Sequence, residues 1–154
     1  MLTGFLNTST RKLFLLKTGI LLLLLASSFS VSSQEKKRVD ILNADYLEAD
    51  DRIAKNAQRL IGNVKIRHKD MLMWADSAYT YTGTNRVNAF GNVHITQGDT
   101  LNLYAKKVYY NGDISFAQAI GNVRMVNKST TLFSDTVDYD LEKNIGYYDN
   151  YGKI

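Results

Sequence analysis

The segment 87–95 reads VNAFGNVHI, and thirty residues later the segment 117–125 reads AQAIGNVRM. In both segments apolar or small residues recur at every second position around a central Gly-Asn-Val, which is the period of a β-strand and not of a helix. The same triplet occurs at 62–64, so Gly62, Gly91 and Gly121 follow one another at spacings of 29 and 30 residues. The chain is therefore predicted to be all-β and built from antiparallel hairpin repeats of about thirty residues.

The residues that flank each triplet keep the same phase. A polar turn follows at 68–70, 97–99 and 127–129, then an apolar pair, and six residues beyond it a tyrosine; a degenerate fourth copy starts at 152. This pattern predicts strands at 85–96, 100–111, 114–126 and 130–140. The segment 50–59 has a helix-like composition, but the repeat places a turn and a strand there, so it is predicted to be strand. The tyrosines are Tyr79, Tyr109 and Tyr139.

The three repeated glycines lie inside predicted strands. A glycine there packs no side chain, and it usually marks a bulge, a sharp bend or the close approach of another group. Because the three glycines are in phase, every second strand should bend at the same height. Such bends would curve the sheet into a trough or a flattened barrel.

The first 33 residues have the features of a secretory signal peptide. Basic residues, the last of them Lys17, precede an apolar run at 19–26, and small residues follow it. The run is shorter than the roughly 20 residues that span a bilayer. We predict a signal peptide over 1–33, cleaved near Ser30 or Ser33, and a mature domain over 34–154. An uncleaved membrane anchor is the alternative.

Composition argues against several classes of function. The chain has no cysteine, which excludes a disulfide framework and a cysteine nucleophile. The net charge is +4, but three of the 19 basic residues and none of the 15 acidic ones precede residue 34, so the mature chain is at +1. A nucleic-acid-binding domain would normally keep a basic stripe in its folded part. We therefore expect no nucleic-acid partner.

The sequence offers no convincing catalytic or metal site. His68 and His94 have no acidic residue at ligand spacing, and we interpret both as exposed residues on strands. Asp138 and Asp140 share a face of their strand, but Asp135 points to the other face, so the three acids do not form a calcium site. We expect no enzymatic activity, no metal and no cofactor.

The Gly-Asn-Val repeats, with their polar turns and apolar pairs, resemble the OstA-like (LptA-type) domain over roughly Val39 to Ile154. The resemblance implies an open, twisted β-jellyroll, or β-taco, whose two apolar inner faces hold acyl chains. It implies a non-catalytic component of lipopolysaccharide transport that is located in the periplasm and can associate with the outer membrane. Its partners would be lipopolysaccharide and similar β-jellyroll modules, or copies of itself, joined head to tail through edge strands. Because Ile154 stands where another strand would begin, we expect a shortened last edge.

The candidate lipid-binding residues are the apolar side chains that recur in phase. Methionines among them suit a surface that accommodates varied partners, and each buried methylene of a lipid contributes about 0.8 kcal/mol. The same side chains would form an ordinary core in a closed sandwich. The sequence also does not decide which face of each strand points inward, because the other face carries large side chains too: Trp74, Tyr104, Tyr110 and Leu132. The candidates are Val64, Ile66, Met71, Met73, Val93, Ile95, Leu101, Leu103, Val123, Met125 and Phe133.

Two other functions are compatible with the repeat. A secreted structural or adhesive β-repeat scaffold would stack its repeats around a closed core and bind no lipid. A polysaccharide-acting β-helix enzyme would gather acidic residues on one face, whereas the acids of this chain are scattered. Binding of lipid by the folded protein would separate the carrier from the scaffold.

Overall fold

The computed structural model describes residues 37–49, 55–81, 83–148 and 153. All of these residues lie in one compact unit, Lys36–Ile154. The predicted signal peptide and the first part of the segment 50–59 lie outside the described residues, whereas the last part of that segment is strand, as predicted. No helix long and apolar enough to cross a membrane occurs in the part of the chain that the structure describes.

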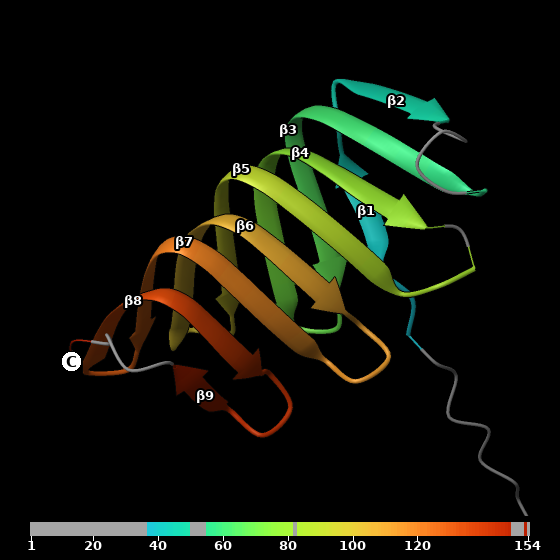
Figure 1. The fold of residues 1–154 in the computed structure, drawn as a ribbon. Helices are drawn as coiled ribbons and strands as arrows, with labels where there is room; N and C mark the ends of the chain where they lie inside the picture. The colour runs from blue at the N-terminus through green and yellow to red at the C-terminus, as the bar shows by residue number, and fades with distance from the viewer. Residues whose placement is uncertain (1–36, 50–54, 82, 149–152, 154) are drawn as a thin grey trace, which may run out of the picture. The chain divides into compact units, whose positions relative to one another are not determined.

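The described residues form one antiparallel sheet of nine strands, which confirms the predicted all-β fold (Figure 1). From β3 to β9 every strand pairs with the next strand along the chain. The expected strand positions agree with the observed ones to within two residues. The strands are β1 (Asp40–Asn43), β2 (Tyr46–Ala49), β3 (Ala57–His68), β4 (Met71–Tyr81), β5 (Arg86–Gln97), β6 (Leu101–Asn111), β7 (Phe116–Asn127), β8 (Thr130–Asp140) and β9 (Ile145–Tyr148).

Strands β1 and β2 are two arms of one bent strand. β1 pairs with the second half of β3, and β2 pairs with its first half. Between the arms, the backbone N–H of Asp45 donates to the carbonyl oxygens of Ile61 and Gly62, at 3.1 and 3.0 Å. This arrangement agrees with the half repeat that precedes the first complete copy in the sequence.

Strands β3, β5 and β7 bend at their Gly-Asn pairs. In β5, Gly91 and Asn92 have φ of +73° and +43°, and the pairing with β6 shifts register between Phe90 and Val93. Two consecutive residues in the left-handed region form a bulge that bends and twists the strand. The pairs at 62–63 and 121–122 have the same conformation. The predicted bend at one common height is therefore confirmed, and Figure 1 shows the strands folding over along one line.

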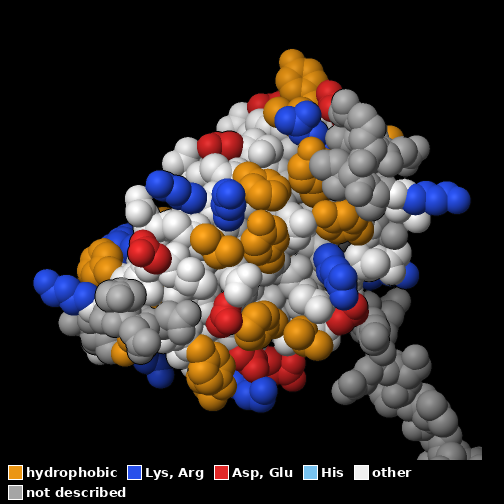
Figure 2. Space-filling model, in the orientation of Figure 1, with side chains coloured by type: hydrophobic (Ala, Val, Ile, Leu, Met, Phe, Trp, Pro, Cys, Tyr) orange, Lys and Arg blue, Asp and Glu red, His pale blue; other side chains and the backbone are white. Residues whose placement is uncertain are grey.

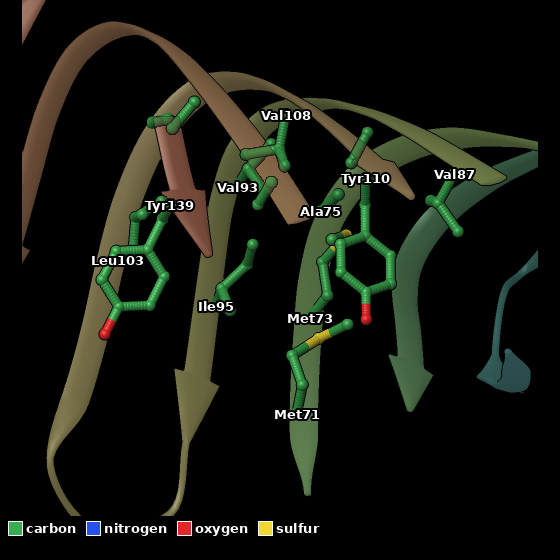
Figure 3. Packing of buried hydrophobic residues seen from close by; sticks show 14 of the residues in the cluster. Met71, Met73, Ala75, Val87, Val93, Ile95, Leu103, Val108, Tyr110 and Tyr139 are labelled. Atoms are coloured by element: carbon green, nitrogen blue, oxygen red, sulfur yellow. The ribbon is translucent and has the colours of Figure 1, made fainter. Parts of the chain in front are cut away.

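The core lies between the two halves of the folded sheet. Figure 3 shows inner side chains from both halves meeting beneath the bend. On β5, the alternating residues Val87, Ala89, Val93 and Ile95 are at most 1% exposed. The methionine and leucine face is thus the inner one, and Trp74 and Tyr104 lie on the outside. Tyr110 and Leu132, which the repeat pattern predicted to lie on the same face as those two, are buried.

The third copy of the repeat differs from the expected alignment by one residue. The turn after β5 has three residues, whereas the turns after β3 and β7 have two, and a shift of one residue moves a side chain to the other face of a sheet. Leu132 therefore faces inward opposite Met125, whereas Phe133 lies outside and is 50% exposed. The prediction that Phe133 lines the interior was wrong. By the same shift, Tyr139 corresponds to the buried Tyr110 and not to the outward-facing Tyr109.

Candidate apolar binding site

Ten of the eleven predicted candidates line one continuous interior, and the exception is Phe133. Each of the ten comes from the half of β3 to β7 that lies between the bend and the turns after β3, β5 and β7. Their side chains are at most 9% exposed, so the interior is as well covered as a protein core. They are Val64, Ile66, Met71, Met73, Val93, Ile95, Leu101, Leu103, Val123 and Met125.

The opposite wall comes from the other half of each strand and was only partly foreseen. It combines larger side chains such as Leu60 and Val108 with the small Ala78, Ala89 and Ala119, all less than 1% exposed. The bulge explains why the alternation of apolar residues along the sequence did not predict every inward-facing residue of this wall. On β4, Ala75 and Ala78 both point inward although they are three residues apart. Alternation therefore changes phase at the bend of β4, β6 and β8.

At the β2 edge of the sheet, apolar side chains of the interior are exposed in the part of the chain that the structure describes. Ile41 pairs with Ile66 and Leu47 pairs with Leu60, so each side chain points to the inner side of the sheet, as its partner does. These two edge side chains are 38% and 56% exposed, although their partners on β3 are fully buried. The apolar surface of the interior thus continues to an edge strand.

A second opening lies at the β8 end of the interior, and we call it the β8 mouth. It is a cavity of about 530 Å³. The core side chains Met125, Leu132 and Tyr139 form its apolar part, and polar residues of the turn after β7 form its rim. Its lining consists of Thr100, Met125, Asn127, Lys128, Ser129, Thr130, Leu132, Tyr139, Asn144, Gly146 and Tyr148.

Along its length, the interior is closed by two rows of turns that we call the lips. The first lip consists of the turns after β3, β5 and β7 with the adjoining strand ends, and the second lip consists of the turns after β4, β6 and β8 with theirs. Side chains join the lips along a seam. Lys69 Nζ donates to Ser115 Oγ at 3.0 Å, and Gln97 Nε2 donates to the Leu141 carbonyl oxygen at 3.1 Å.

His68 belongs to this seam and is 1% exposed, so the expectation of an exposed histidine was wrong. Its Nε2 lies 2.9 Å from the Lys37 carbonyl oxygen, which can only accept, so Nε2 carries the proton. Nδ1 lies 2.6 Å from the Tyr110 hydroxyl, and in the neutral imidazole it accepts from that hydroxyl. Burial is the main cause that raises the pKa of Tyr110 well above its usual 10.0, so this hydroxyl keeps its proton at neutral pH.

The segment before β1 lies across one end of the seam. The Lys37 carbonyl oxygen accepts from His68 of the first lip and, at 3.4 Å, from Asn85 Nδ2 of the second lip. The backbone N–H of Val39 donates to Asn85 Oδ1 at 3.2 Å. This segment therefore joins both lips beside β3.

The outer face carries a row of stacked side chains near the bend, and we call it the outer ladder. Trp74 and His94 stack with ring centroids 5.3 Å apart, and His94 and Tyr104 stack at 4.3 Å. The Lys65 ammonium lies 5.3 Å from the Trp74 ring, and the Arg124 guanidinium lies 4.6 Å from the Tyr104 ring. These cations contact aromatic rings on the outside and do not reach the interior.

The outer face of the other half of the sheet shows no stripe of a single charge. In Figure 2, basic and acidic side chains surround a central group of hydrophobic ones. Phe90 lies edge-to-face against Tyr79 and Tyr109 here, with centroids 6.3 and 6.4 Å apart. In the part of the chain that the structure describes, no three His, Asp or Glu side chains are placed to hold a metal ion.

The model of a family described as OstA-like protein matches residues 36–154. Among solved structures, the fold is similar to that of LptH, the LptA homologous periplasmic component of the conserved lipopolysaccharide transport device from Pseudomonas aeruginosa. The TM-score is 0.65 at 15% identity, and the match covers 77% of this chain and 86% of that one. No curated protein sequence matches the chain.

Proposed function

Because this chain belongs to the OstA-like protein family, we propose that it is a non-catalytic carrier of lipopolysaccharide in the periplasm. Acyl chains of the lipid occupy the apolar interior, and the sugar part remains at the lips. The N-terminal signal peptide predicted from the sequence directs the chain across the inner membrane and is cleaved. The solved structure with a similar fold is that of a periplasmic lipopolysaccharide transport component, which supports this proposal.

The observation that carries the proposal is the apolar interior that runs across the strands and reaches both ends of the sheet. At one end Ile41 and Leu47 expose apolar surface, and at the other end the β8 mouth leads to Met125. A protein core that only supported the fold would gain nothing by exposing these groups. Acyl chains would gain about 0.8 kcal/mol for each methylene that leaves water.

The same two ends support docking of similar modules. Strand β2 is exposed along its whole length and pairs only with β3 among the described residues, so one of its edges presents free backbone groups. Such an edge favours the addition of a strand from another module. Head-to-tail pairing at this edge would cover Leu47 and join two interiors into one longer apolar passage between the membranes.

Photo-crosslinking from two adjacent residues tests the proposal. A photoreactive amino acid at Met125 faces the β8 mouth, and the same amino acid at Arg124 lies on the outer face of β7. The purified chain from Gln34 is irradiated with lipopolysaccharide. We expect a crosslinked lipid adduct from position 125 and little adduct from position 124.

Two results would contradict the carrier function. Equal adducts at both positions would show that the lipid contacts the protein surface without entering. No adduct at either position, from a protein with the β-sheet circular dichroism of the native chain, would show that no lipid is held.

The second result would favour a secreted β-repeat scaffold without a lipid ligand. One observation supports that alternative, because the ten inner candidates are no more exposed than the core of an ordinary sandwich. The carrier therefore requires the two walls to move apart when lipid enters, whereas the scaffold does not.

A further inference from the structure

The interior is sealed along the whole seam between its two open ends. Core side chains nearest the seam, such as Met71 and Leu101, are 1% exposed. An acyl chain could enter by the side only if the lips separated. The nature of the contacts between the lips decides whether such a movement is feasible.

Within each lip, neighbouring turns are joined by backbone hydrogen bonds. In the first lip, the N–H of Lys128 donates to the Thr100 carbonyl oxygen at 3.1 Å, and in the second lip the N–H of Leu141 donates to the Ser115 carbonyl oxygen at 2.9 Å. Each lip is thus continuous with its half of the sheet. We expect each lip to move as a unit.

Between the lips, every hydrogen bond among the described residues involves a side chain. The four direct contacts are spread from β3 to β8, and the segment before β1 adds a bridge beside them. They join His68 to Tyr110, Lys69 to Ser115, Gln97 to the Leu141 carbonyl oxygen, and Asn127 to Tyr139. Bonds of this kind contribute about 0.5–1.5 kcal/mol each, and they can break while every strand ladder stays paired.

The seam is also imperfectly packed. A polar pocket of about 340 Å³ lies between the lips and is lined by side chains that include His68, Lys69 and Gln97. The Oε1 atom of Gln97 is buried and accepts no hydrogen bond from a described protein group. Burying such an atom without a partner costs about 1–3 kcal/mol, and opening the seam would remove that cost. The hydrogen bonding of the closed seam is thus incomplete at this point.

The bulges supply a line about which the two halves can turn. In each hairpin from β3 to β8, the ladder shifts register at the bend, so the paired segments on its two sides are separate. Opening would be absorbed at the Gly-Asn pairs, whose left-handed backbone lies outside the regular strand conformation.

We propose that the four cross-lip contacts form a latch, and that ligand enters the interior sideways when the latch opens and the lips part. This inference rests on the proposed function, since it concerns how the carrier takes up its lipid. The latch keeps the apolar walls together in the free protein and gives way to acyl chains, whose burial offsets the lost hydrogen bonds.

A crosslink across the seam tests the latch. The chain has no cysteine, so Lys69→Cys and Ser115→Cys together create one reactive pair, which a short bis-maleimide joins across the lips. The probe is lipopolysaccharide, and its capture is followed over time through a photoreactive amino acid at Met125. We expect the joined protein to capture lipid about tenfold more slowly than the same variant blocked with a monofunctional maleimide, as for an enzyme lid that cannot open.

The matched control places the same reagent within one half of the sheet, through Gln118→Cys and Asp138→Cys, which are cross-strand partners on its outer face. This crosslink leaves the seam free, so capture should proceed as in its own blocked form. A protein joined at 69 and 115 that captures lipid as fast as its blocked form would overturn the latch while leaving the carrier intact, since lipid would then enter at the ends. No capture by the native chain would overturn the carrier and the latch with it.

A second variant tests the latch without a crosslink. Tyr110→Phe combined with Ser115→Ala removes two cross-lip contacts and no apolar surface of the walls. We expect capture to become severalfold faster in a protein that keeps its β-sheet circular dichroism. Unchanged capture by this variant would contradict the latch.

Discussion

At the scale of single residues, the fold depends on a small contact that recurs at the bend. Asn92 Nδ2 donates to Asp76 Oδ2 at 2.8 Å, and Asn63 Nδ2 donates to Asp45 Oδ2 at 2.9 Å. The carboxylate lies directly over the glycine of the bulge. In the third copy Lys106 takes the place of the acid. The glycine is therefore required both for its backbone conformation and for the space it leaves.

Gly91→Ala should destabilise the protein more than Gly98→Ala. Both glycines have positive φ, but an added methyl group at 91 would collide with the Asp76 carboxylate, whereas at 98 it would meet no atom within 4 Å. We expect Gly91→Ala to lower the free energy of unfolding by about 1–3 kcal/mol more than Gly98→Ala does. Urea denaturation measures the difference, and equal losses would show that the close approach at the bulge is unimportant.

Tyr110 should make the protein sensitive to alkaline pH. Burial raises its pKa in the folded state above the usual 10.0 and outweighs a hydrogen bond with Ser115, which lowers it. As the pH rises past about 10, the unfolded chain releases this proton before the folded chain does, so the free energy of unfolding falls with a slope of up to about 1.4 kcal/mol per pH unit. Tyr110→Phe should reduce this slope in urea denaturation between pH 8 and 11. A slope in Tyr110→Phe equal to that of the native chain would contradict the assignment.

At the scale of structural elements, the outer ladder holds neighbouring strands in register on the side away from the core. Lys65, Trp74, His94, Tyr104 and Arg124 are consecutive cross-strand partners on β3 to β7. Their rings face one another along the sheet, so their faces are already occupied. The ladder therefore stiffens one half of the sheet and is not available to stack against a ligand.

His94→Ala should interrupt the ladder at its centre. We expect it to cost about 1 kcal/mol of unfolding free energy more than Thr96→Ala, the next outward residue of β5. The fluorescence of Trp74, the one tryptophan of the sequence, should change because its stacking partner is lost. In a double-mutant cycle, His94→Ala and Tyr104→Ala should be coupled by about 0.5–1.5 kcal/mol. Additive losses would mean that the rings stack without stabilising the sheet.

Strand positions and the bend were predictable because they depend on short-range patterns. β8 begins and ends where the repeat predicted, at Thr130 and Asp140. The inward position was assigned to Phe133 because the third copy was aligned with the three-residue turn of the second, whereas its own turn, like that of the first copy, has two residues. The burial of His68 was also hidden, since its partners Lys37 and Tyr110 lie 31 and 42 residues away and meet it only when the sheet folds over.

At the scale of the whole domain, the two open ends of the interior belong to different kinds of surface. The β2 end presents an exposed edge strand with inward-facing apolar side chains, whereas the β8 mouth is a cavity with a polar rim. Two unlike ends favour a heterologous, head-to-tail contact over a symmetric one. This asymmetry supports the proposal that modules join in a row.

Leu47→Lys should weaken association between modules. The side chain points to the inner side at the β2 edge, and a charge there would be buried by a strand added from another module. We expect sedimentation velocity to show less self-association, or less binding to a similar module, than for the native chain. Glu48→Lys changes the charge at the next position, whose side chain faces outward, and should have a smaller effect. An equal loss in both variants would indicate a general charge effect and not pairing at the edge.

The order of the strands determines how the length of the interior can vary. Because each strand from β3 to β9 pairs with its neighbour in the chain, one added or deleted hairpin repeat changes the sheet without altering any other pairing. Strands lie about 4.8 Å apart, so each repeat of two strands lengthens the passage by about 10 Å. The length of the interior in such a domain therefore changes in equal steps, and the number of repeats encoded in the gene sets it.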